Sequence, residues 1–325
     1  MPKIPTLPKL LASKIYKTGQ TRGADDDVIF QNRVGRNSTV LISYSSFDKI
    51  VEEDDQFENG YIVLISPDEY FNDPSFGNEL KKRGLSLGEN ALLFYETRSQ
   101  WNKFNPDDKG FSFATSRTAP LGGQYVARVP SLTSESAEKI IKGYSNSKLK
   151  GAGIRVYEYA STEITVKARI QLELLFWHCE NAKAVAKFTG MSDDDIEIRI
   201  KYNTDLATKF ELDNWDELKV MRIINENKNT ICPLCLKPLS ANGFFSKVVQ
   251  AIGREVPDLT ITELNLFHIK ELRIGEYNHK PYNLGWGHHH CNVVTKDAGI
   301  METLVWMKEV IELNEKSGYK ITSDI

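Results

Sequence analysis

Four short apolar runs dominate the pattern of hydrophobic and polar positions in the first half of the chain. They are rich in β-branched and aromatic residues and are separated by turn-forming segments such as NPDDKG and SRTAPLGG, which is typical of strands. The runs are TVLISY at 39–44, YIVLIS at 61–66, ALLFYE at 91–96 and QYVARV at 124–129. We therefore expect a β-rich domain with a few helices in this part of the chain.

From about Thr133 the apolar positions change to helical spacing. The segment SESAEKIIKGY begins after a Ser/Thr cap and carries glutamate in its first turn, as helix starts do. The segment ARIQLELLFWHCENAKAVAKF has apolar residues three and four positions apart and contains neither proline nor glycine, which predicts a long helix. His178 and Cys179 within it are expected to be packing residues. A further helix is predicted at about 215–225.

The chain is predicted to have three parts. Residues 1–30 are polar and contain three prolines, so they are expected to form a flexible arm. Residues 31–212 are expected to form one domain, which is β-rich and then helical, and residues 213–325 a second one. A length of 325 residues with 41% hydrophobic content is sufficient for two packed domains.

Charge and hydropathy exclude some classes of protein. The formal net charge of −3 excludes a globally basic nucleic-acid coat, although a local basic surface remains compatible with it. No run approaches the ~20 apolar residues of a membrane span, and the first twenty residues or so lack the apolar stretch of a signal peptide. We expect a cytoplasmic protein with no membrane partner.

Cysteine and histidine residues gather in the last third of the chain. Cys232 and Cys235 form a C-x2-C pair, and His288 and Cys291 form an H-x2-C pair about fifty residues later. Two residues between ligands let one turn direct both side chains at one ion, and four such ligands complete the tetrahedron of structural zinc. An odd cluster of cysteines without an export signal favours metal over disulfides. We expect structural Zn²⁺; buried free thiols beside an exposed histidine run are the alternative.

Histidine and asparagine residues lie inside this frame in a characteristic order: His268-Ile269, then Asn283-Leu284, then the H-x2-C pair, then Asn292. This order and spacing resemble the HNH (ββα-metal) nuclease family. The resemblance implies an α+β chain whose C-terminal domain is a zinc-braced, treble-clef-like ββα-metal nuclease. The amphipathic segment after Asn292 is then expected to pack on this domain through Leu304, Trp306, Met307, Val310 and Ile311.

The resemblance also implies roles for individual residues. Hydrolysis of a phosphodiester needs a base for the attacking water and a divalent cation to neutralise charge on the phosphate. His268 is implied as the general base, and the ordinary histidine pKa near neutrality suits that task. Asn283 is implied to brace the loop and help orient His268. Asn292 is implied as a ligand of catalytic Mg²⁺, for which Mn²⁺ can substitute.

Phe267 departs from the family pattern. The family usually has aspartate or another ligand directly before the catalytic histidine, and phenylalanine cannot hold a cation. Residues two apart on a strand share a face, so Asn265 and Glu263 are the predicted replacements, with Glu271 and His279 as further candidates. The alternative is that His268 only packs between zinc knuckles, in a non-catalytic zinc-containing DNA-binding protein.

The rest of the chain is expected to choose where DNA is cut. The segment IYKTGQTRGADDDVIFQNRVGRNSTVLISY and the NLGWGHHHCN region look like type II restriction endonucleases of the BstXI kind. That resemblance implies site-specific double-strand cuts in duplex DNA by a homodimer or higher homo-oligomer. The predicted DNA contacts are Arg33, Arg36, Asn37, Lys270, Arg273 and Lys296.

Two alternatives remain for this part of the chain. The VGRNS segment is read equally well as a polar hairpin turn. The recognition domain could instead read methylated cytosine, in which case Tyr95, Trp101 and Phe104 are candidates for the aromatic walls around a flipped base.

Overall fold

The computed structural model describes residues 4–16, 39–50, 57–114, 121–129, 140–143, 153–246, 262–295 and 298–319. The chain forms two compact units. Unit 1 comprises Met1–Thr18, Glu163–Leu272 and Asn278–Ile325, and unit 2 comprises Gly19–Thr162 and Arg273–Tyr277. The helices predicted at the end of the 31–212 domain therefore lie in the same unit as the cysteine pairs. In the described part of the chain, no helix has the length and apolar character that crossing a membrane requires.

Unit 2 contains a six-stranded sheet in the order β5-β4-β3-β2-β1-β6. Its strands are β1 (Thr39–Ser43), β2 (Tyr61–Ile65), β3 (Ala91–Tyr95), β4 (Tyr125–Val129), β5 (Ile140–Lys142) and β6 (Gly153–Arg155). The four predicted strands are confirmed as β1 to β4. All neighbouring strands pair in parallel except β4 and β5, which are antiparallel. The fold is thus a mixed α and β structure with a largely parallel sheet.

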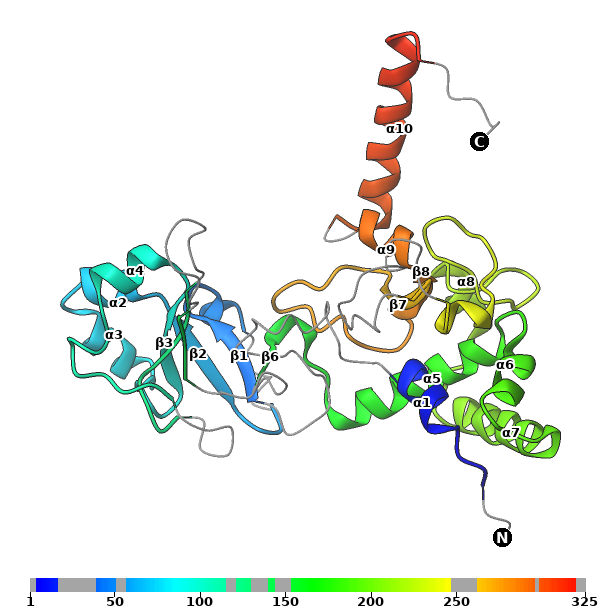
Figure 1. Ribbon diagram of the computed structural model, residues 1–325, viewed down its shortest axis with the longest axis horizontal. Helices are drawn as coiled ribbons and strands as arrows, with labels where there is room; N and C mark the ends of the chain where they lie inside the picture. The colour runs from blue at the N-terminus through cyan, green and yellow to red at the C-terminus, as the bar shows by residue number, and fades with distance from the viewer. Residues whose placement is uncertain are drawn as a thin grey trace. The chain divides into compact units, whose positions relative to one another are not determined.

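Apolar residues cover both faces of this sheet, which explains why its strands read as continuous hydrophobic runs. On one face, Val63 and Leu93 pack with side chains from α2 (Pro67–Asn72), α3 (Phe76–Lys82) and α4 (Arg98–Lys103). These short helices lie beside the strands in Figure 1. Capping boxes at Ser66 with Glu69 and at Thr97 with Gln100 set the starts of α2 and α4. The opposite face carries a second cluster, formed by Leu41, Ile62, Leu64, Leu92, Ala114 and Val126.

Two 3₁₀ turns, Tyr44–Lys49 and Val156–Glu158, follow β1 and β6. The helix predicted for the SESAEKIIKGY segment is wrong for Ile140–Lys142, which form the antiparallel edge strand β5. Ala127 pairs with Lys142 in this register, so a partner distant in sequence decides the conformation there. Residues 130–139 lie outside the described part of the chain.

Unit 1 is largely helical before the segment that carries the C-x2-C and H-x2-C pairs. Its helices there are α1 (Lys9–Ile15), α5 (Thr162–Trp177), α6 (Ala182–Phe188), α7 (Asp193–Lys209) and α8 (Trp215–Val220), with a 3₁₀ turn at Ala241–Phe244. The single long helix predicted at 168–188 is in fact two, because Asn181 adopts a left-handed conformation with φ of 61°. The break lets the backbone of Glu180 pair with that of Leu239 and Ala241, beyond the cysteine pair.

The first residues of the chain differ from the predicted flexible arm. Residues 9–15 form α1, whose Leu11 and Ile15 are fully buried in the unit 1 core. Tyr16, directly after α1, donates its hydroxyl to Glu173 on α5, and Arg199 on α7 donates to both. Because the Glu173 side chain is only 2% exposed, this network fixes α1 against α5 and α7.

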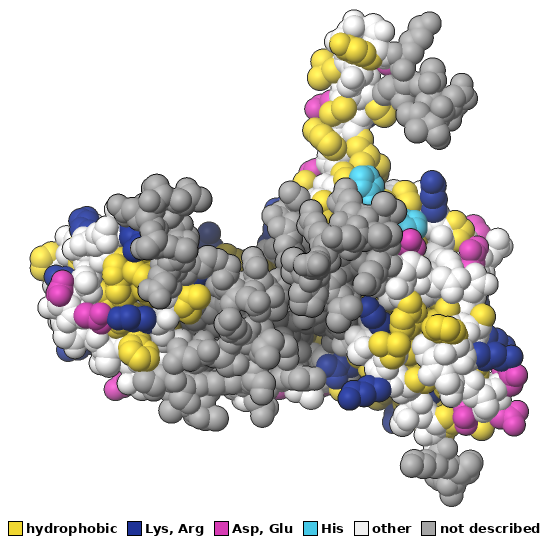
Figure 2. All heavy atoms as spheres, viewed as in Figure 1, with side chains coloured by type: hydrophobic (Ala, Val, Ile, Leu, Met, Phe, Trp, Pro, Cys, Tyr) yellow, Lys and Arg dark blue, Asp and Glu magenta, His cyan; other side chains and the backbone are white. Residues whose placement is uncertain are grey.

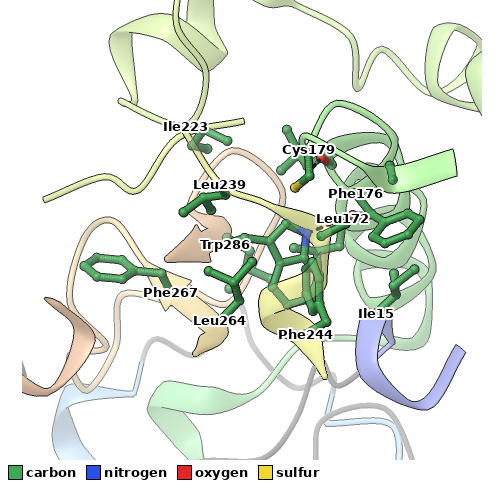
Figure 3. Packing of buried hydrophobic residues seen from close by; sticks show 14 of the residues in the cluster. Ile15, Leu172, Phe176, Cys179, Ile223, Leu239, Phe244, Leu264, Phe267 and Trp286 are labelled. Atoms are coloured by element: carbon green, nitrogen blue, oxygen red, sulfur yellow. Dashed lines mark hydrogen bonds between the residues drawn. The ribbon is translucent and has the colours of Figure 1, made fainter. Parts of the chain in front are cut away.

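Trp286 lies at the centre of the unit 1 core (Figure 3). It is 1% exposed, its ring meets that of Phe244 at a centroid distance of 4.8 Å, and its indole N–H donates to the Leu172 carbonyl at 3.0 Å. This hydrogen bond joins β8 (Leu284–His288) to α5. Cys179, predicted to be a packing residue, is buried in the same cluster, and its thiol donates to the Leu175 carbonyl.

The last described helix, α10 (Ile300–Lys316), packs on unit 1 through its first two turns only. Ile300 and Thr303 are buried, and Leu304 and Met307 are partly buried against the core. Every residue from Lys308 to Tyr319 is exposed. The expectation that Trp306, Val310 and Ile311 also pack on the domain is therefore wrong. These side chains lie in solvent, and hydrophobic side chains line this helix in Figure 2.

Candidate metal centre and hydrolytic site

Two strands and a helix form the structural frame of the site. β7 (Leu264–His268) and β8 (Leu284–His288) pair antiparallel, with His268 opposite Leu284 and Leu264 opposite His288. α9 (His289–Thr295) follows β8 directly and packs on both strands. The sequence therefore places a predicted catalytic histidine at the end of one strand and a predicted metal-binding histidine at the end of the other.

Cys232, Cys235, His288 and Cys291 lie together as predicted. One potential ligand atom from each lies within 4.8 Å of all the others. Sγ of Cys235 is 3.3 Å from Nδ1 of His288, so this ring nitrogen faces the thiols. A tight turn closes the cysteine pair, with the N–H of Leu236 donating to the Cys232 carbonyl at 2.8 Å. The four residues come from two segments that only the fold brings together.

The chemistry of this cluster suits a divalent cation. Burial, followed by the proximity of Cys232 and Cys235, raises the pKa of the Cys291 thiol well above its usual value. Adjacent thiols resist ionisation together unless a cation compensates their charge, and three thiolates with one imidazole nitrogen are a zinc-type donor set. The residues present thus fit a structural metal ion that joins the Cys232 turn to the junction of β8 and α9.

His268 lies at the end of β7 and contacts a second histidine. Its Nε2 is 3.0 Å from Nδ1 of His279, and the ring centroids are 5.2 Å apart. Burial, and then the neighbouring His279, lower the pKa of His268 to about 3. The ring is therefore neutral at pH 7, the state in which a histidine accepts a proton.

Asn283 is buried and holds the segment that follows β7. Its Oδ1 accepts from the N–H of Lys270 at 2.7 Å, and its Nδ2 donates to the carbonyls of Lys270 at 3.0 Å and Asn278 at 2.6 Å. Asn278 in turn donates its amide to the Glu271 carbonyl at 2.7 Å. One side chain thus joins Lys270, two residues after His268, to Asn278, directly before His279.

Asn292 is the fourth residue of α9, rather than the first residue of a helix, and lies against β7. Its Nδ2 is 3.4 Å from the Leu266 carbonyl, two residues before His268. Phe267, in contrast, is fully buried and packs on Gly287, where an added Cβ would meet the phenyl ring at 2.5 Å. Phe267 is therefore a packing residue.

The two predicted replacement ligands differ in their surroundings. Nδ2 of Asn265 is 2.9 Å from Nδ1 of His289 and 3.1 Å from the Thr262 carbonyl, so this amide contacts the start of α9. Glu263 precedes β7 and is exposed, and its carbonyl accepts from the N–H of His289 at 2.7 Å. The contacts made by His279 and His289 were not predicted, because no local pattern distinguishes these histidines from their neighbours in the sequence.

The predicted DNA contacts are only partly described. Lys270 and Arg273 are exposed, as a phosphate-binding residue must be. Arg33, Arg36, Asn37 and Lys296 lie outside the described residues. The three aromatic residues considered for a flipped base, Tyr95, Trp101 and Phe104, are wrong for that role, since all are buried in the unit 2 core and Tyr95 donates its hydroxyl to the Phe104 carbonyl.

Comparison with known proteins adds the family. A model of the BstXI restriction endonuclease family matches residues 13–289. The chain belongs to the BstXI restriction endonuclease family. The match contains Cys232, Cys235, His268 and His288, and ends just before Cys291 and Asn292.

One solved structure similar to this BstXI-family chain is titled "Crystal structure of a type II restriction endonuclease". The two chains are 16% identical and superpose with a TM-score of 0.30 over 48% of this chain. The match spans 56% of that chain, or little more than half of its length. Among curated proteins, none matches the BstXI-family chain.

Proposed function

We propose that this chain is a type II restriction endonuclease of the HNH type, which makes site-specific double-strand cuts in DNA by metal-dependent hydrolysis. The observation that supports it best is His268, neutral and at the end of β7, in a BstXI-family chain. Asn283 holds the segment after it, and α9 brings Asn292 against the same strand. A base, a residue that holds its loop and a possible metal ligand thus converge on one hairpin.

In the proposed reaction, His268 is the general base. The attacking water gives a proton to the imidazole, its oxygen bonds to phosphorus, and the bond from phosphorus to the leaving deoxyribose oxygen breaks. A bound divalent cation, Mg²⁺ with Mn²⁺ as a substitute, would neutralise charge on the phosphate and the leaving oxygen. Asn292 together with Asn265 or Glu263 would hold it, since amide and carboxylate oxygens suit these cations. Asn283 keeps the loop and His268 in place.

The Cys3His cluster is proposed to bind structural Zn²⁺. Cys232, Cys235, His288 and Cys291 offer the soft donors that zinc prefers, and their segments have no other covalent link. A zinc ion there would fix the end of β8, and with it the hairpin that carries His268.

Unit 2 is proposed to read the DNA sequence. Arg33, Arg36 and Asn37 would contact base edges, while Lys270, Arg273 and Lys296 would contact phosphates. The chain offers one such hydrolytic hairpin among its described residues, and a duplex has two strands. We therefore propose that it acts as a homodimer or higher homo-oligomer, with one site for each strand.

Cleavage of plasmid DNA tests the proposal directly. The wild-type chain with Mg²⁺ is expected to give discrete fragments, whereas His268→Ala should give none. His290→Ala is a matched control, because His290 is an exposed histidine of the same domain but lies on α9 rather than on β7. No cleavage of modified or unmodified DNA with either Mg²⁺ or Mn²⁺ would exclude the enzyme.

Phe267 gives one reason to keep a non-catalytic zinc-containing DNA-binding protein as a second candidate. It occupies the position where the HNH family usually has a ligand, and it is buried. Such a protein would shift labelled DNA in a gel without cutting it, and His268→Ala would leave the binding unchanged.

A further inference from the structure

The side chain of His268 contacts that of a second histidine. His279 is 3% exposed and lies eleven positions further along the chain, with its Nδ1 at 3.0 Å from Nε2 of His268. Neutral imidazole has one protonated and one unprotonated nitrogen, so in this contact one ring donates and the other accepts. The contact therefore couples the tautomers of the two rings.

The position of His279 is set by the buried polar residues around it. The carbonyl of Asn278, directly before it, accepts from the side-chain amide of Asn283 at 2.6 Å. The side-chain amide of Asn278 donates to the Glu271 carbonyl at 2.7 Å. Asn278 and Asn283 are 7% and 3% exposed, so water competes little for these bonds. The segment that leaves His268 thus returns to it along a defined path and delivers His279 against its ring.

Only one direction of the hydrogen bond makes His268 a base. If His279 donated, Nε2 of His268 would accept that proton and Nδ1 of His268 would carry its own. The one unprotonated nitrogen of His268 would then be occupied by His279 and could not accept a proton from water. If His268 donates from Nε2, its Nδ1 is unprotonated and is the nitrogen not engaged by His279. His268 is also the more exposed ring of the pair.

We propose that His279 is a positioning residue, which accepts from Nε2–H of His268 and thereby leaves Nδ1 of His268 as the proton acceptor. This inference rests on the proposed function, because it assigns a tautomer to the proposed general base. When Nδ1 takes the proton of the attacking water, the charge formed on His268 is stabilised through the Nε2–H bond to His279. A neutral histidine here does the work that a carboxylate does beside other catalytic histidines.

Nuclear magnetic resonance of the full chain labelled with ¹⁵N-histidine measures this tautomer without any cleavage. The chain has six histidines, and the His268 signals are those lost in His268→Gln. We expect wild-type His268 to show a protonated Nε2 and an unprotonated Nδ1. A protonated Nδ1 in the neutral wild-type protein would overturn the inference.

Two substitutions separate positioning from packing. His279→Phe keeps a ring but removes the acceptor, and is expected to mix the His268 tautomers and to lower kcat by about 10- to 100-fold with little change in KM. His279→Asn places an amide oxygen near the position of Nδ1, and should restore the single tautomer and most of kcat. The role is contradicted if His279→Phe has the same spectra and kcat as wild type. It is also contradicted if His279→Asn has the unfolding temperature of wild type but restores neither the single tautomer nor kcat.

The outcomes also distinguish this inference from the proposed function. If His268→Ala cleaves DNA as well as wild type, the general base is wrong, whatever the spectra show. If His268→Ala is inactive but wild-type His268 carries its proton on Nδ1, the proposed general base is supported and the positioning role of His279 is wrong.

Discussion

Asn283 uses both ends of its amide inside the protein. Its oxygen accepts one backbone N–H, and its nitrogen donates to two carbonyls. Asn283→Asp keeps the acceptor for the N–H of Lys270 but places an oxygen opposite those carbonyls. Because buried polar groups that lose their partners cost about 1–3 kcal/mol each, we expect Asn283→Asp to lower the free energy of unfolding by at least that amount and to reduce cleavage.

Urea denaturation and single-turnover cleavage would measure the two effects of Asn283→Asp. Asn242→Asp is a suitable control, since Asn242 is exposed in the 3₁₀ turn at Ala241–Phe244 and only its backbone carbonyl accepts from Phe245 and Ser246. Equal stability of Asn283→Asp and wild type would show that the loop does not depend on this amide.

The lowered pKa of His268 predicts how stability depends on pH. The folded protein keeps this ring neutral down to pH about 3, whereas the unfolded chain takes up the proton near the ordinary histidine pKa of 6.5. Between these two pKa values the unfolded state binds more protons than the folded state. The free energy of unfolding therefore falls as the pH falls, by up to about 1.4 kcal/mol per pH unit from this residue. Above pH 6.5 the effect vanishes.

Urea titrations at a series of pH values would measure this effect. In His268→Gln the slope of unfolding free energy against pH between 6.5 and 4 should be smaller than in wild type. The same slope in both proteins would place His268 in an environment that tolerates its charge.

Residue spacing predicted much of the candidate site, and the reason is local. C-x2-C and H-x2-C pairs are defined by turns of a few residues, and the structure brings Cys232, Cys235, His288 and Cys291 together. The contact of His268 with His279 depends instead on the return path of the segment between them. That path is set by the side-chain amides of Asn283 and Asn278, which donate to backbone carbonyls and leave no periodic pattern in the sequence.

At the scale of elements, apolar runs predicted β1 to β4 because a strand buried on both faces needs apolar residues throughout. Their parallel order was not predicted, since pairing joins strands far apart in the sequence. The break before α6 was missed for the same reason: Glu180 pairs with residues beyond the cysteine pair. Helical spacing alone predicted one continuous helix there.

The network that fixes α1 gives a prediction about stability. Arg199→Ala would leave the carboxylate of Glu173 buried without its positively charged partner, which typically costs about 3–5 kcal/mol. Lys201→Ala is the control: it removes an exposed pair with Asp205 on the same helix, α7, and exposed pairs of this kind contribute about 0.3–0.5 kcal/mol. Guanidinium denaturation of both variants would measure the contrast, and similar losses would contradict it.

The Cys3His cluster predicts the metal content. The purified chain should contain one zinc per chain by elemental analysis, and Cys291→Ser should lose it together with part of its thermal stability. Cys179→Ala is the matched control, because Cys179 is also buried but bonds to the Leu175 carbonyl, apart from the cluster. Zinc retained in Cys291→Ser and lost in Cys179→Ala would place the metal elsewhere.

At the scale of the whole molecule, the exposed part of α10 is relevant to the proposed homo-oligomer. Trp306, Val310 and Leu313 are exposed and spaced at i, i+4 and i+7, the spacing of apolar positions in paired helices. Glu302 and Lys316 flank this stripe on the same side at opposite ends of the helix. In an antiparallel pair these opposite charges would meet, which favours a second copy of α10 as the partner.

Analytical ultracentrifugation tests this pairing. The double variant Trp306→Glu/Leu313→Glu is expected to sediment as a smaller species than wild type and to cut one strand of a plasmid where wild type cuts two. Ile311→Glu is the control, because Ile311 is also exposed but lies about 140° around the helix from Trp306. A wild-type monomer, or a double variant with the wild-type mass, would remove α10 from the interface.

Unit 1 is assembled from separated stretches of the chain, with most of unit 2 lying between the first and the second. During translation α1 leaves the ribosome first, yet its partners α5 and α7 follow more than a hundred residues later. At about 5–20 residues per second, the residues of unit 2 up to Thr162 can fold while the β7–β8 hairpin is still unsynthesised. Translation products that stop before residue 283 lack Asn283, half of the Cys3His cluster and Asn292. In a cell that makes this protein, the surface proposed to read DNA is therefore synthesised before the residues proposed to cut it.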